Sequence, residues 1–422
     1  MKPWDYYSFR NIESKQWASF QMLKEIQSKK LRKIIDYAYK NVNYYRRMFN
    51  ELDIDPVDIR SKEDLTEIPI TTREMIQSAA PKDLISKKII PSQLKAITTA
   101  GSCGKPLTLY IRQKEFDLNN LYWARASRAN GQKLFGSAVY FKYDAPPRFW
   151  FEKLGIWKKN IVPITETLEE KISKLKQIKP IIIRGNAYEL TSIAQYILDQ
   201  GVKGIKPKKI FSMGSLLDKK GRKLLEQVFQ AEIFDYYAAT ECGLIAWECS
   251  QHQGYHINMD AVVLELITNN KTADPGKPGR VICTNLNYKS MPIIRYDLGD
   301  IGILTTNNCP CNRKLPLLKK IEGRADDFFI DNVGNLYSPS DIINKVKSIP
   351  GIRAFKLIQL KNDLIQAEIV TIENSKTRIT KLMNATLKTI MGEKMLVKIN
   401  FCSRINRDPE RKIRAMISYV KR

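Results

Sequence analysis

Short apolar runs alternate with longer amphipathic segments between residues 137 and 236, and this rhythm constrains the fold more than any other feature. Each apolar run has the length of a buried strand, and each amphipathic segment has the apolar spacing of a helix. Repeated strand–helix–strand units place their strands side by side in a parallel sheet covered by helices. The expected strands are 137–141, 180–183, 209–213 and 231–236, and the expected helices are 168–178, 188–198 and 219–229.

The pattern changes on both sides of this region. Residues 13–50 have helical spacing and form the core of a helical amino-terminal part that we place at 1–95. After Tyr255, apolar runs at 261–267 and 279–284 are joined by turn residues, which indicates an antiparallel or barrel-like subdomain.

A charged turn, Glu-Gly-Arg-Ala-Asp-Asp, precedes the last stretch of the chain. That stretch is predicted to hold a helix from Pro339, strands at 354–360 and 364–371, a helix at 378–391 and a strand at 395–401. It is long enough for a small α+β domain of its own. We therefore predict an α/β protein with one domain at 1–325 and a second at 326–422.

Lysine and arginine outnumber the acidic residues by 70 to 44, giving a formal net charge of +26. Such an excess favours polyanions, so a nucleic-acid-binding protein is the rival interpretation from a different class. The basic residues are scattered, however, and we find no helix-turn-helix, RNA-recognition or zinc-finger pattern; a solvated lysine-rich surface is the simpler interpretation. No apolar run has the length of a membrane span or a signal peptide, and we expect a soluble, cytoplasmic protein.

The sharpest local motif is a small-residue loop at 98–106, Thr-Thr-Ala-Gly-Ser-Cys-Gly-Lys-Pro. Two glycines, exposed amides, hydroxyls and one lysine suit a loop that holds phosphate groups. It is not a Walker A loop, because Thr99 stands where that motif needs its first glycine and Pro106 stands where it needs serine or threonine. A glycine-rich turn between two strands is the alternative for this segment alone.

Three further motifs follow: Tyr-Tyr-Ala-Ala-Thr-Glu-Cys-Gly at 236–243, Met-Pro-Ile-Ile-Arg-Tyr-Asp-Leu-Gly-Asp-Ile-Gly at 291–302, and Gly-Arg-Ala-Asp-Asp at 323–327. Together with the small-residue loop, their order and spacing resemble the adenylate-forming superfamily of acyl-CoA synthetases and adenylation domains. Within it, the chain looks most like the phenylacetate-CoA ligase branch and its CapK-type capsule-biosynthesis relatives. The resemblance implies a large amino-terminal adenylate-forming domain, with parallel sheets and a β-rich subdomain, and a small mobile carboxyl-terminal domain.

The activity implied by this resemblance is that of an AMP-forming ligase. A small-molecule carboxylate would react with ATP and Mg²⁺ to give an acyl-adenylate and pyrophosphate, and the acyl group would then pass to a thiol, most simply that of coenzyme A. Alternatively, the acceptor is a carrier protein, an amine or a capsular sugar in a polysaccharide pathway. A degenerate member that binds nucleotide without turnover is a further alternative, motivated by the unusual residues Ala100, Cys103, Ala238 and Arg411.

The resemblance also assigns residues to the nucleotide. The implied phosphate-binding residues are Thr99, Gly101, Ser102, Gly104 and Lys105. Glu241 would bind Mg²⁺ and Thr240 would contact the α-phosphate, and both are implied to be catalytic, while Tyr237 would stack on adenine. From the residues alone, a Thr-Glu pair after a strand is also a common start of a helix.

Further along the chain, the resemblance implies that Asp300 accepts both ribose hydroxyls, a task that suits the two acceptor oxygens of a carboxylate. Arg324 would contact the ribose and phosphate. Asp326 falls at the hinge about which the small domain would rotate between the two half-reactions. Lys412, in a segment similar to the lysine loop of these enzymes, would be the catalytic lysine that points at the α-phosphate and the carboxylate.

A second cluster consists of cysteine and histidine. Cys249 and His256 lie seven residues apart, and Cys309-Pro310-Cys311 follows further along the chain. Three thiolates and one imidazole are enough for a tetrahedral structural zinc site, and the phenylacetate-CoA ligase branch often carries a similar arrangement. His252 is a competing ligand, and buried free cysteines are the alternative on spacing alone.

The acyl-binding residues are expected within four segments, 141–144, 186–188, 212–216 and 236–239. These segments mix aromatic and small residues, which suits an aromatic or medium-length acyl group no better than several others.

Overall fold

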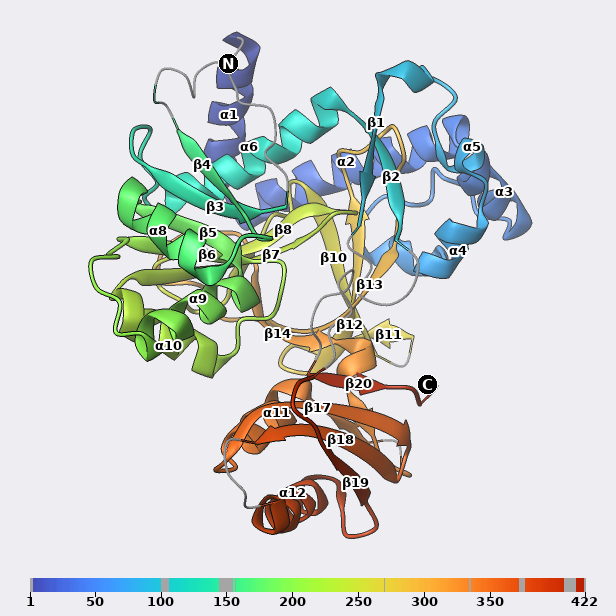
Figure 1. Cartoon of the computed structure of the whole chain (residues 1–422). Helices are drawn as coiled ribbons and strands as arrows, with labels where there is room; N and C mark the ends of the chain where they lie inside the picture. The colour runs from blue at the N-terminus through green and yellow to red at the C-terminus, as the bar shows by residue number, and fades with distance from the viewer. Residues whose placement is uncertain are drawn as a thin grey trace.

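The computed structural model describes residues 3–99, 106–143, 155, 157–268, 270–333, 335–371, 376–405 and 415–420. These residues form a twelve-stranded mixed sheet, a four-stranded sheet near the carboxyl end and two short two-stranded ribbons. Figure 1 shows the large sheet flanked by helices, with the small sheet below it. Among the described residues, no helix is both long and apolar enough to cross a bilayer.

One half of the large sheet is parallel, in the order β4-β3-β5-β6-β7. Its strands are β3 (Ala138–Lys142), β4 (Lys159–Pro163), β5 (Ile182–Asn186), β6 (Lys209–Met213) and β7 (Glu232–Ala239). One face is covered by the helices between these strands, α8 (Leu168–Ile178), α9 (Ala187–Asp199) and α10 (Lys219–Phe229). The other face packs against α6 (Gln113–Ala129). The predicted parallel sheet is confirmed.

Alternate side chains of these strands belong to two different cores. Val139 and Ile183 pack with α8, α9 and α10, whereas Phe211, Phe234 and Tyr236 belong to the core on the α6 face. Successive residues of a strand point to opposite faces of the sheet. If one residue of a strand faces α8, α9 and α10, the next residue therefore points toward α6.

The predicted strand at 180–183 begins later than expected, at Ile182. The preceding helix α8 ends at Ile178, and its C-cap residue Lys179 has a left-handed backbone with φ of +46°. Pro180 follows and has no N–H to donate to a neighbouring strand. The strand consequently starts two residues later and extends to Asn186, which then caps α9 through a 2.8 Å hydrogen bond from the backbone N–H of Glu189.

The other half of the large sheet is antiparallel, as expected for the chain after Tyr255. It is continuous with the parallel half, because β7 pairs with β8 and β9 pairs with both β8 and β14. Its strands are β8 (Gly243–Glu248), β9 (Tyr255–Ile257), β10 (Val262–Thr268), β11 (Lys271–Thr272), β12 (Pro278–Asn285), β13 (Tyr296–Thr305) and β14 (Leu317–Arg324).

The amino-terminal part is helical, followed by a hairpin. Its elements are α1 (Pro3–Lys15), α2 (Phe20–Asn41), α3 (Asn43–Glu51), α4 (Arg73–Ser78), α5 (Pro81–Leu84), β1 (Leu94–Thr98) and β2 (Thr108–Arg112), with 3₁₀ turns at Glu63–Glu67 and Pro91–Gln93. The predicted helix over 13–50 is divided by Ser19, whose hydroxyl caps α2, and by Val42, which has an extended backbone. Helices α2 and α3 pack on the antiparallel half of the sheet.

A buried ion pair holds this amino-terminal part to the sheet. The side chains of Arg295 and Glu265 are 3.2 Å apart, and Arg295 also donates to the backbone oxygen of Thr66 at 3.0 Å. Both charged side chains are almost wholly buried, so removal of either one would leave an uncompensated charge. The pair therefore fixes the position of the segment that leads into α4.

The carboxyl-terminal sheet has the order β19-β18-β17-β20 and its own hydrophobic core. Its elements are β15 (Phe329–Ile330), β16 (Leu336–Tyr337), α11 (Pro339–Lys347), β17 (Ile352–Lys361), β18 (Leu364–Thr371), α12 (Lys376–Met391), β19 (Leu396–Phe401) and β20 (Met416–Ser418), preceded by a 3₁₀ turn at Ala325–Asp327. Helices α11 and α12 and strands β17, β18 and β19 correspond to those expected from the sequence, whereas β20 was not expected. A domain boundary at 325/326 stays a prediction.

Candidate active site

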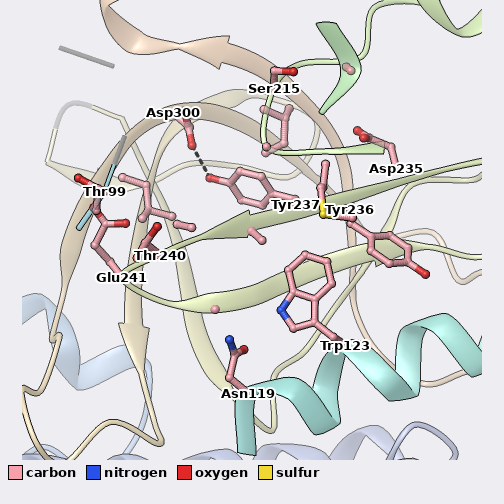
Figure 2. A pocket seen from close by; sticks show the side chains of 18 of the residues that line it. Thr99, Asn119, Trp123, Ser215, Asp235, Tyr236, Tyr237, Thr240, Glu241 and Asp300 are labelled. Atoms are coloured by element: carbon pink, nitrogen blue, oxygen red, sulfur yellow. Dashed lines mark hydrogen bonds between the residues drawn. The ribbon is translucent and has the colours of Figure 1, made fainter. Parts of the chain in front are cut away.

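A cleft of about 2490 Å³ opens at the carboxyl ends of β6 and β7 and extends to β13, β14 and the carboxyl-terminal sheet. Open α/β sheets bind ligands at this edge. Figure 2 shows Thr99, Thr240 and Glu241 at one end of the pocket, with Tyr237 pointing at Asp300. The predicted nucleotide residues that line the cleft are Thr99, Tyr237, Thr240, Glu241, Asp300 and Arg324.

The end of β7 supplies several of these side chains. Tyr236 and Tyr237 point to opposite faces of the sheet, since side chains alternate along a strand. An irregularity in the pairing with β8 follows, between Tyr237 and Ala238. The chain then turns, so that Thr240 is exposed at the cleft and Glu241 is largely buried.

Gly243 holds the turn after Glu241 in place. Its φ of +74° lies in the region that favours glycine, and a Cβ atom there would lie 2.2 Å from Oδ1 of Asn119. The same Asn119 oxygen accepts a 3.2 Å hydrogen bond from the backbone N–H of Leu244. The turn of the Thr-Glu-Cys-Gly motif is thus fixed against α6, a contact that the sequence analysis did not identify.

The Glu241 carboxylate has two neighbours with hydrogen-bond donors. The hydroxyl of Tyr296 donates to it at 3.3 Å, and the guanidinium of Arg73 lies 3.9 Å away. Arg73 also donates to the hydroxyl oxygen of Thr99 at 2.8 Å, and that oxygen accepts the backbone N–H of Leu107 at 3.0 Å. Arg73 therefore links the predicted magnesium ligand to the start of the small-residue loop.

Arg73 was not identified from the sequence. It is the first residue of α4, after the capping residue Thr72, and it lies far along the chain from the four motifs. An arginine at the start of a short amphipathic helix has no local signal of a binding role, because such residues are usually exposed. The contact with Glu241 exists only because the antiparallel half of the sheet brings α4 to the cleft.

Asp300, Tyr237 and Arg324 form a second group. The Tyr237 hydroxyl donates to Oδ2 of Asp300 at 2.7 Å, and Arg324 approaches Oδ1 at 3.4 Å from the facing position on β14. Arg324 also donates to the backbone oxygen of Leu298 at 2.5 Å. Burial and then the negative charge of Asp300 raise the pKa of Tyr237 well above its usual value, so the hydroxyl keeps its proton.

Several predicted site residues lie outside the described ranges. They are Gly101, Ser102, Gly104, Lys105 and Lys412. The first four belong to the connection between β1 and β2, whose described flanks are Thr99, next to the Thr98–Thr108 pair, and Pro106. Asp326 lies in the 3₁₀ turn after Arg324. The structure therefore brings Thr99, Tyr237, Thr240, Glu241, Asp300 and Arg324 to one cleft.

The cleft continues past Tyr236 along the α6 face of the parallel strands. The ring of Trp123 from α6 lies 5.7 Å from that of Tyr236, and Phe211 stacks on Tyr236 at 5.3 Å, between ring centroids. Arg184 and Tyr140 also line this part. Trp123, Tyr140 and Arg184 lie outside the segments expected to bind the acyl group.

The expected acyl-binding segments are only partly at the cleft. Their members that line it are Lys142, Ala187, Tyr188, Met213, Gly214, Ser215, Leu216, Tyr236, Tyr237, Ala238 and Ala239. Phe141 belongs to the core on the α8-to-α10 face instead. Phe141 differs from its neighbours Tyr140 and Lys142, which line the cleft, because successive residues of β3 point to opposite faces of the sheet.

Comparisons with known proteins agree with this arrangement. The chain is 25% identical over 352 residues to a phenylacetate-coenzyme A ligase of Thermus thermophilus, covering 79% of this chain and 77% of the relative. It is 24% identical over 430 residues to that of Aromatoleum evansii, covering 93% of each. Residues 329–419 match the CapK C-terminal domain. The chain belongs to the adenylate-forming ligase superfamily.

Within this superfamily the chain is phenylacetate-CoA ligase-like and carries a CapK-type carboxyl-terminal domain, which places it in the AMP-forming acid–CoA ligase family. Solved structures share its fold. A 2-hydroxyisobutyryl-CoA ligase in complex with an acyl-AMP has a TM-score of 0.79 at 17% identity, covering 96% of this chain and 91% of that one. An anthranilate CoA ligase in complex with anthranoyl-AMP has a TM-score of 0.59 at 13% identity, covering 78% and 66%.

The cysteine and histidine cluster of this ligase-family chain comes together behind the cleft. The donor atoms of Cys249, His256, Cys309 and Cys311 all lie within 4.8 Å of one another. The Sγ atoms of Cys249 and Cys309 are 3.5 Å apart, and Nε2 of His256 lies 3.4 Å from Cys249 and 3.2 Å from Cys311. Ligands about 2.0–2.3 Å from a tetrahedral zinc ion have similar mutual spacings, so the four residues fit such an ion.

Protonation also suits His256 for this role. Burial, aided by the positive charge of Arg313, lowers the pKa of His256 to about 4, so the imidazole is neutral near pH 7. His252, the competing candidate, lies elsewhere: its two ring nitrogens face Glu232 at 3.7 Å and Glu248 at 3.6 Å. The structure therefore favours His256 as the fourth ligand.

A buried acidic network lies next to the cleft on β7 and β8. Arg222 of α10 donates to both carboxylate oxygens of Glu248 at 2.8 and 2.7 Å, and Glu248 accepts the backbone N–H of Asp235 at 2.8 Å. The hydroxyl of Tyr255 donates to Asp235 at 2.8 Å. Burial and then the charge of Glu248 raise the pKa of Asp235 to about 6.

Proposed function

We propose that this protein activates a carboxylic acid with ATP and transfers the acyl group to coenzyme A. In the first step the substrate carboxylate attacks the α-phosphorus of ATP, giving acyl-adenylate and releasing pyrophosphate. In the second step the thiol of coenzyme A attacks the acyl carbon, giving the thioester and AMP. The observation that carries the proposal is the convergence of Glu241, the Tyr237–Asp300–Arg324 group and Thr99, which come from distant segments, in one cleft.

The chain's own groups supply what the first step requires. Glu241 is a largely buried carboxylate with a hydroxyl and a guanidinium beside it, so one oxygen can serve a cation at the cleft. A magnesium ion held there would neutralise charge on the phosphates. Thr240 would contact the α-phosphate, and Thr99 with Gly101, Ser102, Gly104 and Lys105 would hold the other phosphates.

The ribose and adenine would occupy the Tyr237–Asp300–Arg324 group. Asp300 offers two acceptor oxygens, which at present receive a hydroxyl from Tyr237 and approach the Arg324 guanidinium. Bound ribose hydroxyls would compete with Tyr237 for these oxygens, which would release its ring to lie against adenine. The positive charge of Arg324 would then lie near the ribose and phosphate.

For the second step we propose that residues 326–422 move as one domain about Asp326. Within the described residues, the side-chain contacts between this part and the body include Ser338 to Glu322 at 2.6 Å and Lys347 to Asp218 at 2.6 Å. Exposed or half-buried polar contacts of this kind contribute little stability each, so they can be exchanged for others. Lys412 would serve adenylation and then withdraw.

We propose a structural role for zinc bound by Cys249, His256, Cys309 and Cys311. Four protein ligands leave no open position for water or substrate. The residues join the end of β8 and the start of β9 to the connection between β13 and β14. Such an ion would brace the strands that carry both Glu241 and Asp300.

The test is ATP–pyrophosphate exchange with Mg²⁺, using a panel of aryl, fatty, hydroxy, amino and dicarboxylic acids. Exchange that depends on one class of acid, is lost in Glu241→Gln and in Lys412→Ala, and is followed by thioester formation with coenzyme A is the expected result. Thiolysis of added acyl-adenylate should survive Lys412→Ala. Exchange without consumption of coenzyme A would redirect the second step to a carrier protein, amine or sugar, and ATP binding without exchange for any acid would contradict the proposal.

A further inference from the structure

The far wall of the cleft carries an arginine that the proposed reaction steps do not use. Arg184 is on β5, next in sequence to Ile183, which packs with α8, α9 and α10. Its side chain therefore points to the α6 face, in one row with Tyr140, Phe211 and Phe234, its partners across the strands. Arg184 lines the cleft and is only 4% exposed.

The positive charge of Arg184 has no carboxylate partner in the part of the chain that the structure describes. Its two hydrogen bonds both come from Nη2, to Oγ of Ser127 at 2.7 Å and to the side-chain oxygen of Gln132. Its Nε atom is buried with no hydrogen-bond partner among the described residues. A buried charge with no opposite charge nearby is costly, and an anion that enters the cleft would supply one.

Aromatic rings surround the same guanidinium. The rings of Phe211, Tyr140 and Tyr236 lie 4.2, 5.2 and 6.0 Å from its central carbon. Such rings stabilise the cation by their faces, and they also hold the planar guanidinium in one orientation. A planar, oriented guanidinium can bind a carboxylate or phosphate through two parallel hydrogen bonds.

Two lysines strengthen the positive character of this end. Lys142 and Lys159 both line the cleft, on the neighbouring strands β3 and β4. Desolvation, followed by the positive charges of Lys159 and Arg184, lowers the pKa of Lys142. An anion bound among these groups would relieve the repulsion between them, whereas an uncharged acyl group would leave it in place.

The distance to the nucleotide residues sets the length of the ligand. Two strand spacings, from β5 to β7, and four residues along β7 separate the Cα atoms of Arg184 and Ala238 by roughly 16 Å. An arginine side chain covers only part of this distance. The rest corresponds to an acyl group several bonds long, which would lie in the cleft beside Trp123 and Tyr236.

We propose that the acid activated by this protein carries a second anionic group at its far end, a carboxylate or a phosphate, and that Arg184 binds this group. The inference rests on the proposed function and names its substrate class. The carboxylate near Thr240 and Glu241 is activated, while the second anionic group stays ionised at Arg184 and fixes the orientation of the substrate. Phenylacetate and other monoacids of similar size lack this contact.

The test compares matched acids in ATP–pyrophosphate exchange by the wild-type protein: hexanoate with adipate, phenylacetate with 4-carboxyphenylacetate, and a phosphorylated acid of similar length. We expect kcat/KM to be about 100-fold higher for the better dianionic acid than for its monoacid. In Arg184→Met this ratio should fall to near one through a higher KM for the dianion, with KM for ATP unchanged. Arg184→Lys should retain part of the preference.

Arg128→Met provides the matched control, since Arg128 lies outside the cleft on α6 and pairs with Glu13 at 2.9 Å. Equal kcat/KM for monoacids and dianionic acids in the wild type, or an Arg184→Met variant that loses both in proportion, would overturn the inference. If no acid supports exchange, the proposed function fails by itself. In that case, the binding of dianionic acids can be measured by thermal unfolding. Stabilisation of the wild type that is absent in Arg184→Met and weaker in Arg184→Lys would still support an anion site at Arg184. No stabilisation of the wild type would reject the inference.

Discussion

At the nucleotide end of the cleft the charged side chains face opposite charges: Glu241 lies near Arg73 and Asp300 lies near Arg324. At the acyl end, Arg184 lies among aromatic rings, with no carboxylate partner in the described part of the chain. At the nucleotide end each of these charges already has an opposite charge beside it, so bound ATP would have to displace these partners. At the acyl end, no opposite charge faces Arg184 among the described residues, and we propose that the substrate supplies it.

The two ends also differ in how the sequence supplies their residues. Each predicted nucleotide residue lies within a short motif, so a single sequence segment supplies each predicted contact with the nucleotide. The acyl end takes Trp123 from α6, Tyr140 from β3, Arg184 from β5 and Tyr236 from β7, one residue from each element. A substitution at one end should therefore change the KM for ATP and the KM for the acid by different factors.

The largest effect is expected for Glu241→Gln, at the nucleotide end. Glutamine keeps the hydrogen bond from Tyr296 but cannot hold a cation as a carboxylate does, so kcat for pyrophosphate exchange should fall about 1,000-fold. Steady-state exchange at saturating acid measures the loss. Full activity in this variant at ordinary Mg²⁺ concentrations would contradict the proposed role of Glu241 as a magnesium ligand.

Cys309→Ser should affect both ends together, because the proposed zinc ion would brace β8 and the β13–β14 connection. We expect loss of bound zinc and a decrease in stability of about 3–4 kcal/mol, the amount that mass action gives for a ligand at roughly 100–1,000 times its Kd. Metal analysis and thermal unfolding measure the two quantities. Cys402→Ser, in the carboxyl-terminal sheet, is the control, and a metal-free wild type with the same unfolding temperature would refute the zinc site.

Asp300→Asn should act on ATP alone. The amide keeps one acceptor oxygen but loses the charge and the second acceptor, so KM for ATP should rise about 10- to 100-fold. KM for the acid should stay within about twofold, since the acyl end is separate. Asp274→Asn, an exposed position, serves as the control. Equal increases for both substrates would show that the two ends are not independent.

The sequence predicts much of the fold because the element ends carry local signals. Helix α8 has the expected bounds, since Thr167 caps its start and Lys179 adopts a left-handed backbone at its end. The same holds for α10, between Asp218 and Gln230. These signals act over a few residues and need no knowledge of the tertiary structure.

The site was predictable only where a motif is local. Glu241 and Asp300 were predicted from such motifs; the structure places both at the cleft, and their roles stay predictions. Arg184 could not be predicted, because an arginine in a short apolar run has no periodic or motif signal, and its place at the cleft depends on α6 and on the neighbouring strands β3 and β6. The choice between His252 and His256 likewise needed the position of Cys311, 55 residues from His256 along the chain.

The smallest predicted effect concerns Asp235, on the face of β7 opposite Tyr236. It concerns the stability of the fold and neither end of the cleft. The pKa of Asp235 is raised from 3.8 to about 6, so between these values the folded protein holds a proton that the unfolded chain releases. Stability contributed by this group is therefore greatest near pH 4 and falls as the pH rises through about 6. Asp235→Asn removes the buried charge and should stabilise the protein near pH 7 by on the order of 1–2 kcal/mol, with little difference near pH 4.

Glu248→Gln should instead destabilise the protein near pH 7. Burial alone would raise the pKa of Glu248, but interactions with His252 and Arg222 outweigh it and lower that pKa. Urea unfolding at several pH values measures both, and a neutral-pH loss of stability in Asp235→Asn would show that its charge supports the fold.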